Sequence, residues 1–196
     1  MRAAGYFAAV PSGDRRRRPL VPTERMLTLM RKRWGAHLSA TSYVLPEVAG
    51  CDARLDDPAF AKSFLLALSE VYIGGTRMIE HAPELEMFID RNAGLMILYS
   101  LALSGSADGP FPPLAPVPLS INALAKALSV SRKHVLTLLR DAEARDLLAR
   151  GGAANDEITL LPRLRTALEM WFAAIFLTFA QSAARECDRR PNSAVA

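Results

Sequence analysis

The feature that most constrains this chain is a pair of short helices encoded between Pro118 and Pro162, because both helix starts carry the same capping pattern. Ser120 and Ser131 each occupy an N-cap position, with apolar residues before and after at the spacing of a hydrophobic staple. Neither start has the Glu or Gln that completes a capping box. Ser129 and Val130 leave almost no linker. We therefore expect the two helices to cross rather than to lie antiparallel.

Apolar residues recur in both helices at the three-and-four spacing of helical packing, and this spacing predicts which faces are buried. The predicted buried set is Leu124, Ala125, Leu128, Val135, Leu138, Leu139 and Ala142. The outward set on the second helix is Arg132, Lys133, Leu136, Thr137 and Arg140. Three cations beside a hydroxyl and an aliphatic side chain suit contacts with phosphates and with base edges together.

The period of the sequence changes after the second helix and predicts a two-stranded hairpin. A short apolar run at 147–148 leads to the turn residues Gly151 and Gly152, and residues 157–160 then alternate as in a half-buried strand. Arg150 lies at the base of this hairpin. From there its side chain could reach a phosphate or the minor groove of DNA.

Together these elements resemble the winged-helix transcription regulators, and the MarR-type family most closely. The resemblance rests on LSINALAKALSVSRKHVLTLLRDAEARDLLARGG and covers residues 95–161. In that family the helix corresponding to Ser131 to Ala144 is the recognition helix, which lies in the major groove. The resemblance therefore implies DNA-contacting roles for a set of side chains on this helix. They are Arg132, Lys133, Thr137 and Arg140.

The same comparison bears on Arg150 and Ser129, and a separate expectation concerns His134. Wing contact with DNA carries over to Arg150 alone. Ser129 stands where such motifs often have glycine, so we expect a strained left-handed backbone there. His134 is expected to be a partly exposed surface residue rather than a reader of bases. From Val117 to Pro162 there are six Lys or Arg against five Asp or Glu, so the motif is only weakly basic.

Positive charge is concentrated at the start of the chain. Residues 1–37 contain nine Lys or Arg against two acids, and the remainder is net acidic. Arg15 to Arg18 form an uninterrupted run in a stretch poor in apolar residues. Residues 1–22 are therefore predicted to be a disordered basic arm. Such an arm could lie along DNA or could be a solvated tail.

The rest of the amino-terminal half is predicted to be helical and to serve dimerisation or effector binding over residues 23–92. Thr23 and Asp57 are placed to cap two of its helices. Five prolines between Pro110 and Pro118 must keep that stretch out of a helix. The helix before them is either the first helix of the winged region, residues 93–162, or the end of a separate domain.

The last helix, residues 163–187, is strongly apolar and precedes a short tail predicted to be disordered, residues 188–196. Its uncharged run from Met170 to Ala184 is shorter than the roughly 20 residues that a membrane span needs. We therefore expect no membrane association. A helix buried partly against a copy of itself is the better interpretation, and the resemblance implies that it forms a dimer.

The sequence also bears on the expected compartment and on catalytic chemistry. The order of apolar and basic residues near the amino terminus is not that of a secretory signal, so the chain is expected to be cytoplasmic. Cys51 and Cys187 are too few for a disulfide framework and suit a reducing compartment, where they would simply pack or form a redox switch. No catalytic, cofactor or metal motif is present in the sequence, so we expect neither an enzyme nor a cofactor nor a metal.

The sequence thus predicts a mainly α protein. Its expected parts are a winged helix-turn-helix with a two-stranded β wing, additional amino-terminal helices and a long carboxy-terminal dimerisation helix. The expected function is sequence-specific regulation of transcription by a homodimer bound to double-stranded DNA at an inverted repeat. An unidentified small-molecule effector is a further expected partner. The alternative is a winged-helix module that binds another protein and not DNA.

Overall fold

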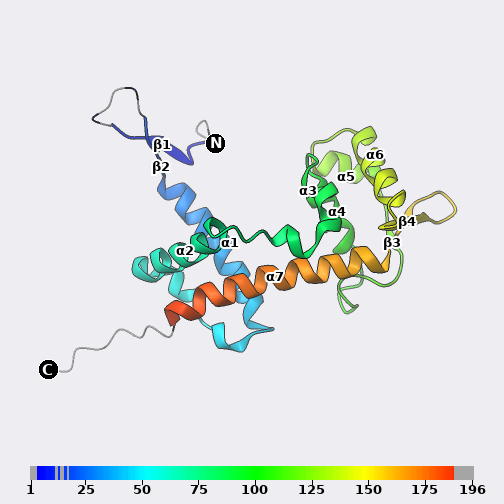
Figure 1. Ribbon diagram of the computed structural model, residues 1–196. Coiled ribbons are helices and arrows are strands. Elements are labelled where there is room, and N and C mark those ends of the chain that lie inside the picture. Colours follow the sequence, from blue (N-terminus) through cyan, green and yellow to red (C-terminus); the bar gives the residue numbers. More distant parts are fainter. Residues whose placement is uncertain (1–3, 12, 14–15, 17, 188–196) are drawn as a thin grey trace. The chain divides into compact units, whose positions relative to one another are not determined.

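The computed structural model describes residues 4–11, 13, 16 and 18–187, with backbone alone at 186 and 187 (Figure 1). The chain is mainly helical and forms two compact units. Unit 1 comprises residues 1–76 and 176–196, and unit 2 comprises residues 77–175. Helix α7, Pro162–Cys187, contributes its first half to unit 2 and its second half to unit 1.

Unit 1 is built on two capped helices. Its elements are β1 (Phe7–Ala9), β2 (Leu20–Pro22), α1 (Glu24–Ser42), the 3-10 turns η1 (Pro46–Val48) and η2 (Ala53–Asp56), α2 (Pro58–Ile73) and the end of α7. The predicted caps are confirmed, since the side chain of Thr23 accepts a hydrogen bond from Met26 N and that of Asp57 accepts one from Ala59 N. The core forms around Phe64, which is fully buried and packs against the rings of Trp34 and Phe179.

The start of the chain differs from the disordered arm expected over residues 1–22. Strands β1 and β2 pair antiparallel, with Phe7 opposite Pro22 and Ala9 opposite Leu20. The physical reason is a contact that composition does not reveal, because the hydroxyl of Thr23 lies 2.7 Å from the carbonyl oxygen of Gly5. This contact ties the first strand to the start of α1.

Cys51 of unit 1 also differs from the expectation that the cysteines simply pack. Cys51 is 2% exposed and is disulfide-bonded. The other cysteine of the chain is Cys187, whose side chain lies outside the described residues. The disulfide at Cys51 thus differs from the reduced, packed cysteine that a reducing compartment would favour.

Unit 2 combines short helices with a small antiparallel sheet. Its elements are the 3-10 turns η3 (Met78–His81) and η4 (Pro83–Leu85), α3 (Glu86–Ile89), α4 (Gly94–Ala102), β3 (Val117–Pro118), α5 (Ile121–Ala127), α6 (Arg132–Glu143), β4 (Leu148–Gly151), β5 (Glu157–Leu160) and the start of α7. One hydrophobic core joins all of these helices, with Phe88, Ile97 and Leu138 fully buried in it. The sheet order is β3-β5-β4, so a third strand adds to the predicted hairpin.

The proline-rich stretch belongs to unit 2 and does not separate two domains. Its end forms β3, in which Val117 pairs with Ile158 of β5. Phe111 packs edge-on against Phe172 of α7, with ring centroids 5.3 Å apart. Helix α4 packs against α6 across the same core. The boundary between the units falls instead after Thr76, so residues 77–92 join the unit that contains α6.

Helix α7 is long and apolar enough to cross a membrane by length and composition alone, over the 24 residues from Pro162 to Arg185. In the apolar window of this helix 39% of the residues are buried inside the protein. The core helix of a soluble protein meets the same criterion. Leu164, Leu168 and Ala183 are fully buried, as the apolar pattern predicts.

Candidate nucleic-acid interface

Helix α6 carries most of the side chains that the sequence singled out. Ser131 is its N-cap, as predicted, and the Ser131 hydroxyl accepts a hydrogen bond of 3.1 Å from His134 N. Ser120 caps α5 in the same way, through Ala123 N at 3.3 Å. Two side-chain caps at this spacing hold the short connection between the helices in place.

The two sides of α6 differ sharply in burial. Its inner side is completely buried and consists of Val135, Leu138, Leu139 and Ala142, the four residues predicted for it. Its outer side is exposed and includes the four predicted contact residues Arg132, Lys133, Thr137 and Arg140. Leu136 is half-buried between the two sides. The helix therefore presents its cations to solvent while it is fixed rigidly to the core.

Both acidic residues of α6 are bound by arginines from other elements. Arg91, which follows α3, forms an ion pair of 2.5 Å with Asp141. Arg150 of β4 forms an ion pair of 2.6 Å with Glu143. In the described part of the chain, Arg132 and Lys133 form no ion pair. The acids of the helix are thus paired with arginines from other elements, while Arg132 and Lys133 at its start are exposed.

Arg150 therefore contacts α6, a contact that the sequence does not indicate. Its Nε and Nη2 donate to Glu143 Oε2 at 2.8 and 2.6 Å, and its backbone N donates to Glu143 Oε1 at 3.1 Å. These hydrogen bonds hold the pKa of the Glu143 carboxyl below its ordinary value, with a smaller contribution from the charge of Arg140. The Arg150 side chain is 23% exposed and folds back onto α6.

Ser129, in the connection before α6, and His134, in its first turn, agree with the sequence expectations. Ser129 has a φ of 54°, which is the left-handed conformation expected where related motifs have glycine. His134 is half-buried, and its Nε2 lies 2.7 Å from the carbonyl oxygen of Asn92. Because a carbonyl only accepts, that ring nitrogen carries the proton and donates. The His134 side chain is therefore engaged in a hydrogen bond within the protein.

The turn between β4 and β5 is acidic. Asp156 and Glu157 lie at its end and are exposed, and no Lys or Arg occurs between Gly151 and Glu157. A carboxylate brought near a phosphate is repelled. The hairpin tip is thus a poor surface for a nucleic-acid backbone, in contrast to the outer side of α6.

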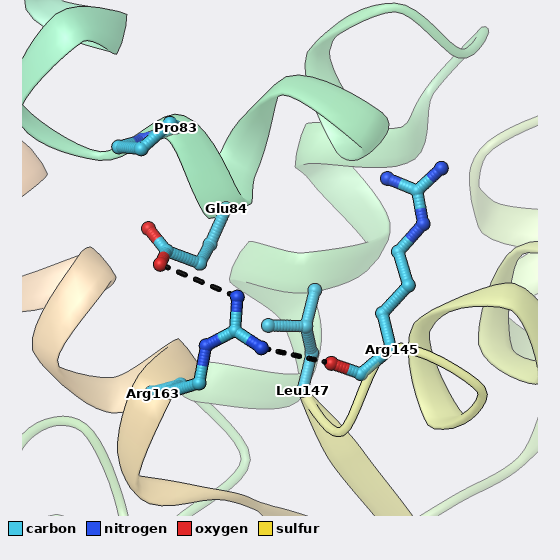
Figure 2. A pocket seen from close by; sticks show the side chains of 5 residues that line it. All are labelled: Pro83, Glu84, Arg145, Leu147 and Arg163. Carbon is cyan, nitrogen blue, oxygen red and sulfur yellow. Dashed lines mark hydrogen bonds and ion pairs between the residues drawn. The ribbon is translucent and has the colours of Figure 1, made fainter.

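A cavity of ≈ 380 Å³ lies beside the end of α6 and is lined by Pro83, Glu84, Arg145, Leu147 and Arg163 (Figure 2). Arg163 of α7 donates to Glu84 Oε1 at 3.5 Å and to the Arg145 carbonyl oxygen at 3.2 Å. Figure 2 shows the Arg145 guanidinium turned away from this pair. These bonds join the start of α7 to η4 and to the turn after α6, which is a structural role.

Among the residues that the structure describes, no group of three His, Cys, Asp or Glu side chains could hold a metal ion. Comparison with protein-family models, with curated proteins and with solved structures found no match. The candidate interface therefore rests on the residues of this chain alone. The sequence pattern predicts the exposed residues of α6 but gives no sign of Arg91 and Glu143, which lie in ion pairs that no local pattern indicates.

Proposed function

We propose that this protein is a sequence-specific DNA-binding regulator of the winged-helix type, with α6 lying in the major groove. The observation that carries the proposal is the exposed side of α6, where Arg132, Lys133, Thr137 and Arg140 lie over a completely buried apolar side. An α-helix fits the major groove of B-form DNA. Arginine and lysine can bind phosphates and guanine edges, and threonine can reach either.

The ion pairs of α6 support this orientation. Because Asp141 and Glu143 are bound by Arg91 and Arg150, the start of the helix retains its positive charge. The dipole of the helix adds a partial positive charge at the same end. Arg132 and Lys133 lie in the first turn, so their charges and the helix dipole all favour an anion near the start of α6.

The proposed regulator acts as a homodimer through α7. Thr166, Met170 and Ala173, all in the part of α7 that belongs to unit 2, are exposed and follow one another at steps of four and three residues. Met170 is 47% exposed. This spacing is that of a helix–helix seam, and a second copy of α7 would bury it. Two α6 helices related by a two-fold axis would read an inverted repeat with half-sites about 34 Å apart.

An effector would have a cavity available within unit 1. A groove of ≈ 420 Å³ between α1 and α2 is lined mainly by apolar side chains, including Leu27, Trp34 and Leu65. Lys62 adds positive charge to its lining, while the Arg31 guanidinium, which also lines it, is paired with Glu24. Its volume lies in the usual range for small-molecule sites. An anionic, largely apolar molecule would suit this lining.

Selection of bound duplexes from a random pool at moderate salt tests the proposal. We expect enrichment of an inverted repeat by the unaltered protein, and loss of enrichment in the double variant Arg132→Ala, Lys133→Ala. The matched control Arg33→Ala, Arg185→Ala removes two exposed cations from unit 1 and should still enrich the repeat. Size measurements should show the same dimer for all three proteins.

The second candidate is a protein-binding module without DNA binding. The acidic hairpin turn at Asp156 and Glu157, together with the folded-back Arg150, favours it. If the pool yields no enriched sequence while the protein is dimeric and folded, this second function replaces the first.

A further inference from the structure

We propose that the exposed cations of α6 have two different roles, and that each half-site of the bound DNA carries two G·C pairs about two to three base-pair steps apart. Lys133 and Arg140 read the guanines of these pairs, and Arg132 binds a phosphate. The inference rests on the proposed function and deepens it, because it states which sequences α6 would select.

The position of each side chain around the helix axis separates the two roles. Successive residues of an α-helix are rotated by about 100°. Lys133, Thr137 and Arg140 therefore lie within about 60° of one another, opposite the buried side of the helix. Arg132 is rotated by about 80° or more from each of the three, which places it at one edge of the exposed side.

This arrangement decides which part of a duplex each side chain would meet. The major groove is about 12 Å wide, and an α-helix with its side chains has a diameter of about 10–12 Å, so a helix fills the groove. Side chains at the centre of the outward side then point at the base edges on the floor of the groove. A side chain at the edge points at the sugar-phosphate backbone, which positions a protein without reading sequence. Arg132 therefore meets a phosphate.

The chemistry of the central side chains favours guanine over adenine. Guanine offers two acceptors in the major groove, O6 and N7, and lysine and arginine can donate to both. Adenine is read by Asn or Gln, and neither residue type occurs between Arg132 and Glu143. The hydroxyl of Thr137 can donate or accept, so the base pair between the two guanines is read less selectively.

The central side chains are available for such contacts. Lys133, Thr137 and Arg140 are exposed, and in the part of the chain that the structure describes none of them has a side-chain hydrogen bond or an ion pair. The two acids of α6 lie toward the edges of its exposed side and are both paired with arginines of other elements. No unpaired carboxylate of α6 therefore faces the base edges or the phosphates.

The spacing of the three central residues sets the distance between the two guanines. Lys133, Thr137 and Arg140 follow one another at steps of four and three residues. Lys133 and Arg140 are thus about 10.5 Å apart along the helix, the length of about three base-pair steps. In zinc fingers, helix residues at similar steps contact three successive bases. Both geometries place the guanines about two to three steps apart.

The test uses the full-length protein and begins with selection of bound duplexes from a random pool at moderate salt. Fluorescence anisotropy then compares the selected duplex with duplexes in which either G·C pair of one half-site is replaced by A·T. The variants are Arg132→Ala, Lys133→Ala and Arg140→Ala. The control is Arg33→Ala, which removes one exposed cation from unit 1. Circular dichroism checks that all of these proteins fold alike.

Replacing either G·C pair should weaken binding of the unaltered protein by about 5- to 150-fold, the factor that corresponds to loss of one paired base contact. Lys133→Ala should no longer distinguish one of the two pairs, and Arg140→Ala should no longer distinguish the other. Arg132→Ala should weaken binding to all duplexes by the same factor. It should also make the slope of log affinity against log salt shallower by about 0.9 per protomer. The control should match the unaltered protein.

Three results would overturn the inference while the proposed function stands. The first is an enriched repeat whose half-sites lack such a pair of G·C positions. The second is a uniform loss of affinity in Lys133→Ala and Arg140→Ala with both base preferences kept, since phosphate contacts behave in this way. The third is a changed base preference in Arg132→Ala. Failure to enrich any sequence would instead refute the proposed function itself, and the inference with it.

Discussion

Replacing Glu143 by Gln tests the ion pair that joins α6 to the β4–β5 hairpin. Arg150 donates to Glu143 Oε2 from Nε at 2.8 Å and from Nη2 at 2.6 Å. Gln retains an oxygen that can accept from the Arg150 backbone N but carries no charge. We therefore expect the hairpin to stay in place while the guanidinium is released. The loss of one partly exposed ion pair should cost about 0.2–1 kcal/mol of stability.

The effect on DNA binding follows from the released cation. One additional phosphate contact per protomer should steepen the slope of log affinity against log salt by about 0.9, or by about 1.8 for a dimer. Over a rise from about 50 to 200 mM salt, the Glu143→Gln dimer should lose about tenfold more affinity than the unaltered protein. At the lower salt concentration it should bind more tightly.

The matched control is Glu157→Gln at the hairpin turn. Glu157 is exposed and forms no ion pair with a described residue, so this variant removes the same charge without releasing an arginine. Anisotropy titrations should show a smaller change of slope for Glu157→Gln than for Glu143→Gln. Adding Arg150→Ala to Glu143→Gln should remove the gain. Equal slopes in the two single variants, or a gain that survives Arg150→Ala, would refute the reasoning.

Four further outcomes are expected from stability measurements. The pKa of Glu143 is lowered in the folded state, so its ion pair stabilises the protein above the ordinary pKa of 4.5, and this contribution is lost as pH falls through the lower folded value. Urea titrations should therefore show that the free energy of unfolding falls less steeply at acid pH for Glu143→Gln than for the unaltered protein. Ser129→Gly should raise the free energy of unfolding by about 0.5 kcal/mol, since relief of a left-handed φ slightly exceeds the entropy cost of glycine. Gly94→Ala should destabilise by about 1–3 kcal/mol although alanine favours helices, because its Cβ would lie 2.2 Å from the Phe88 carbonyl oxygen. Leu138→Ala should cost about 2–5 kcal/mol from a fully buried position, and a change below about 1 kcal/mol in urea unfolding would contradict the assigned face.

The elements around α6 could be predicted because their signals are local. The N-cap of α6 at Ser131 and the left-handed Ser129 depend on residues within one helical turn. The buried face of α6 depends on a spacing that repeats every three or four residues. These features are present in the sequence before any other part of the chain is placed.

The ion pairs of the candidate site could not be predicted in this way. Arg91 and Asp141 are separated by 50 positions, and nothing in the sequence near either residue indicates the other. The sequence predicts that Arg150 lies in the hairpin, but it does not indicate that the guanidinium lies 2.6 Å from Glu143. An ion pair depends on separation in space, which the packing of α6 against β4 decides.

The helices around α6, their caps and the outward cations of α6 follow from local patterns of residues, because each of these depends on neighbours within a few positions. Packing in three dimensions sets which charges remain available, the pairing of β3 with β5 and the pairing of β1 with β2. Strand pairing and charge pairing join residues that are distant along the chain. Their partners are therefore selected by how the elements pack, and no local pattern of residues specifies them.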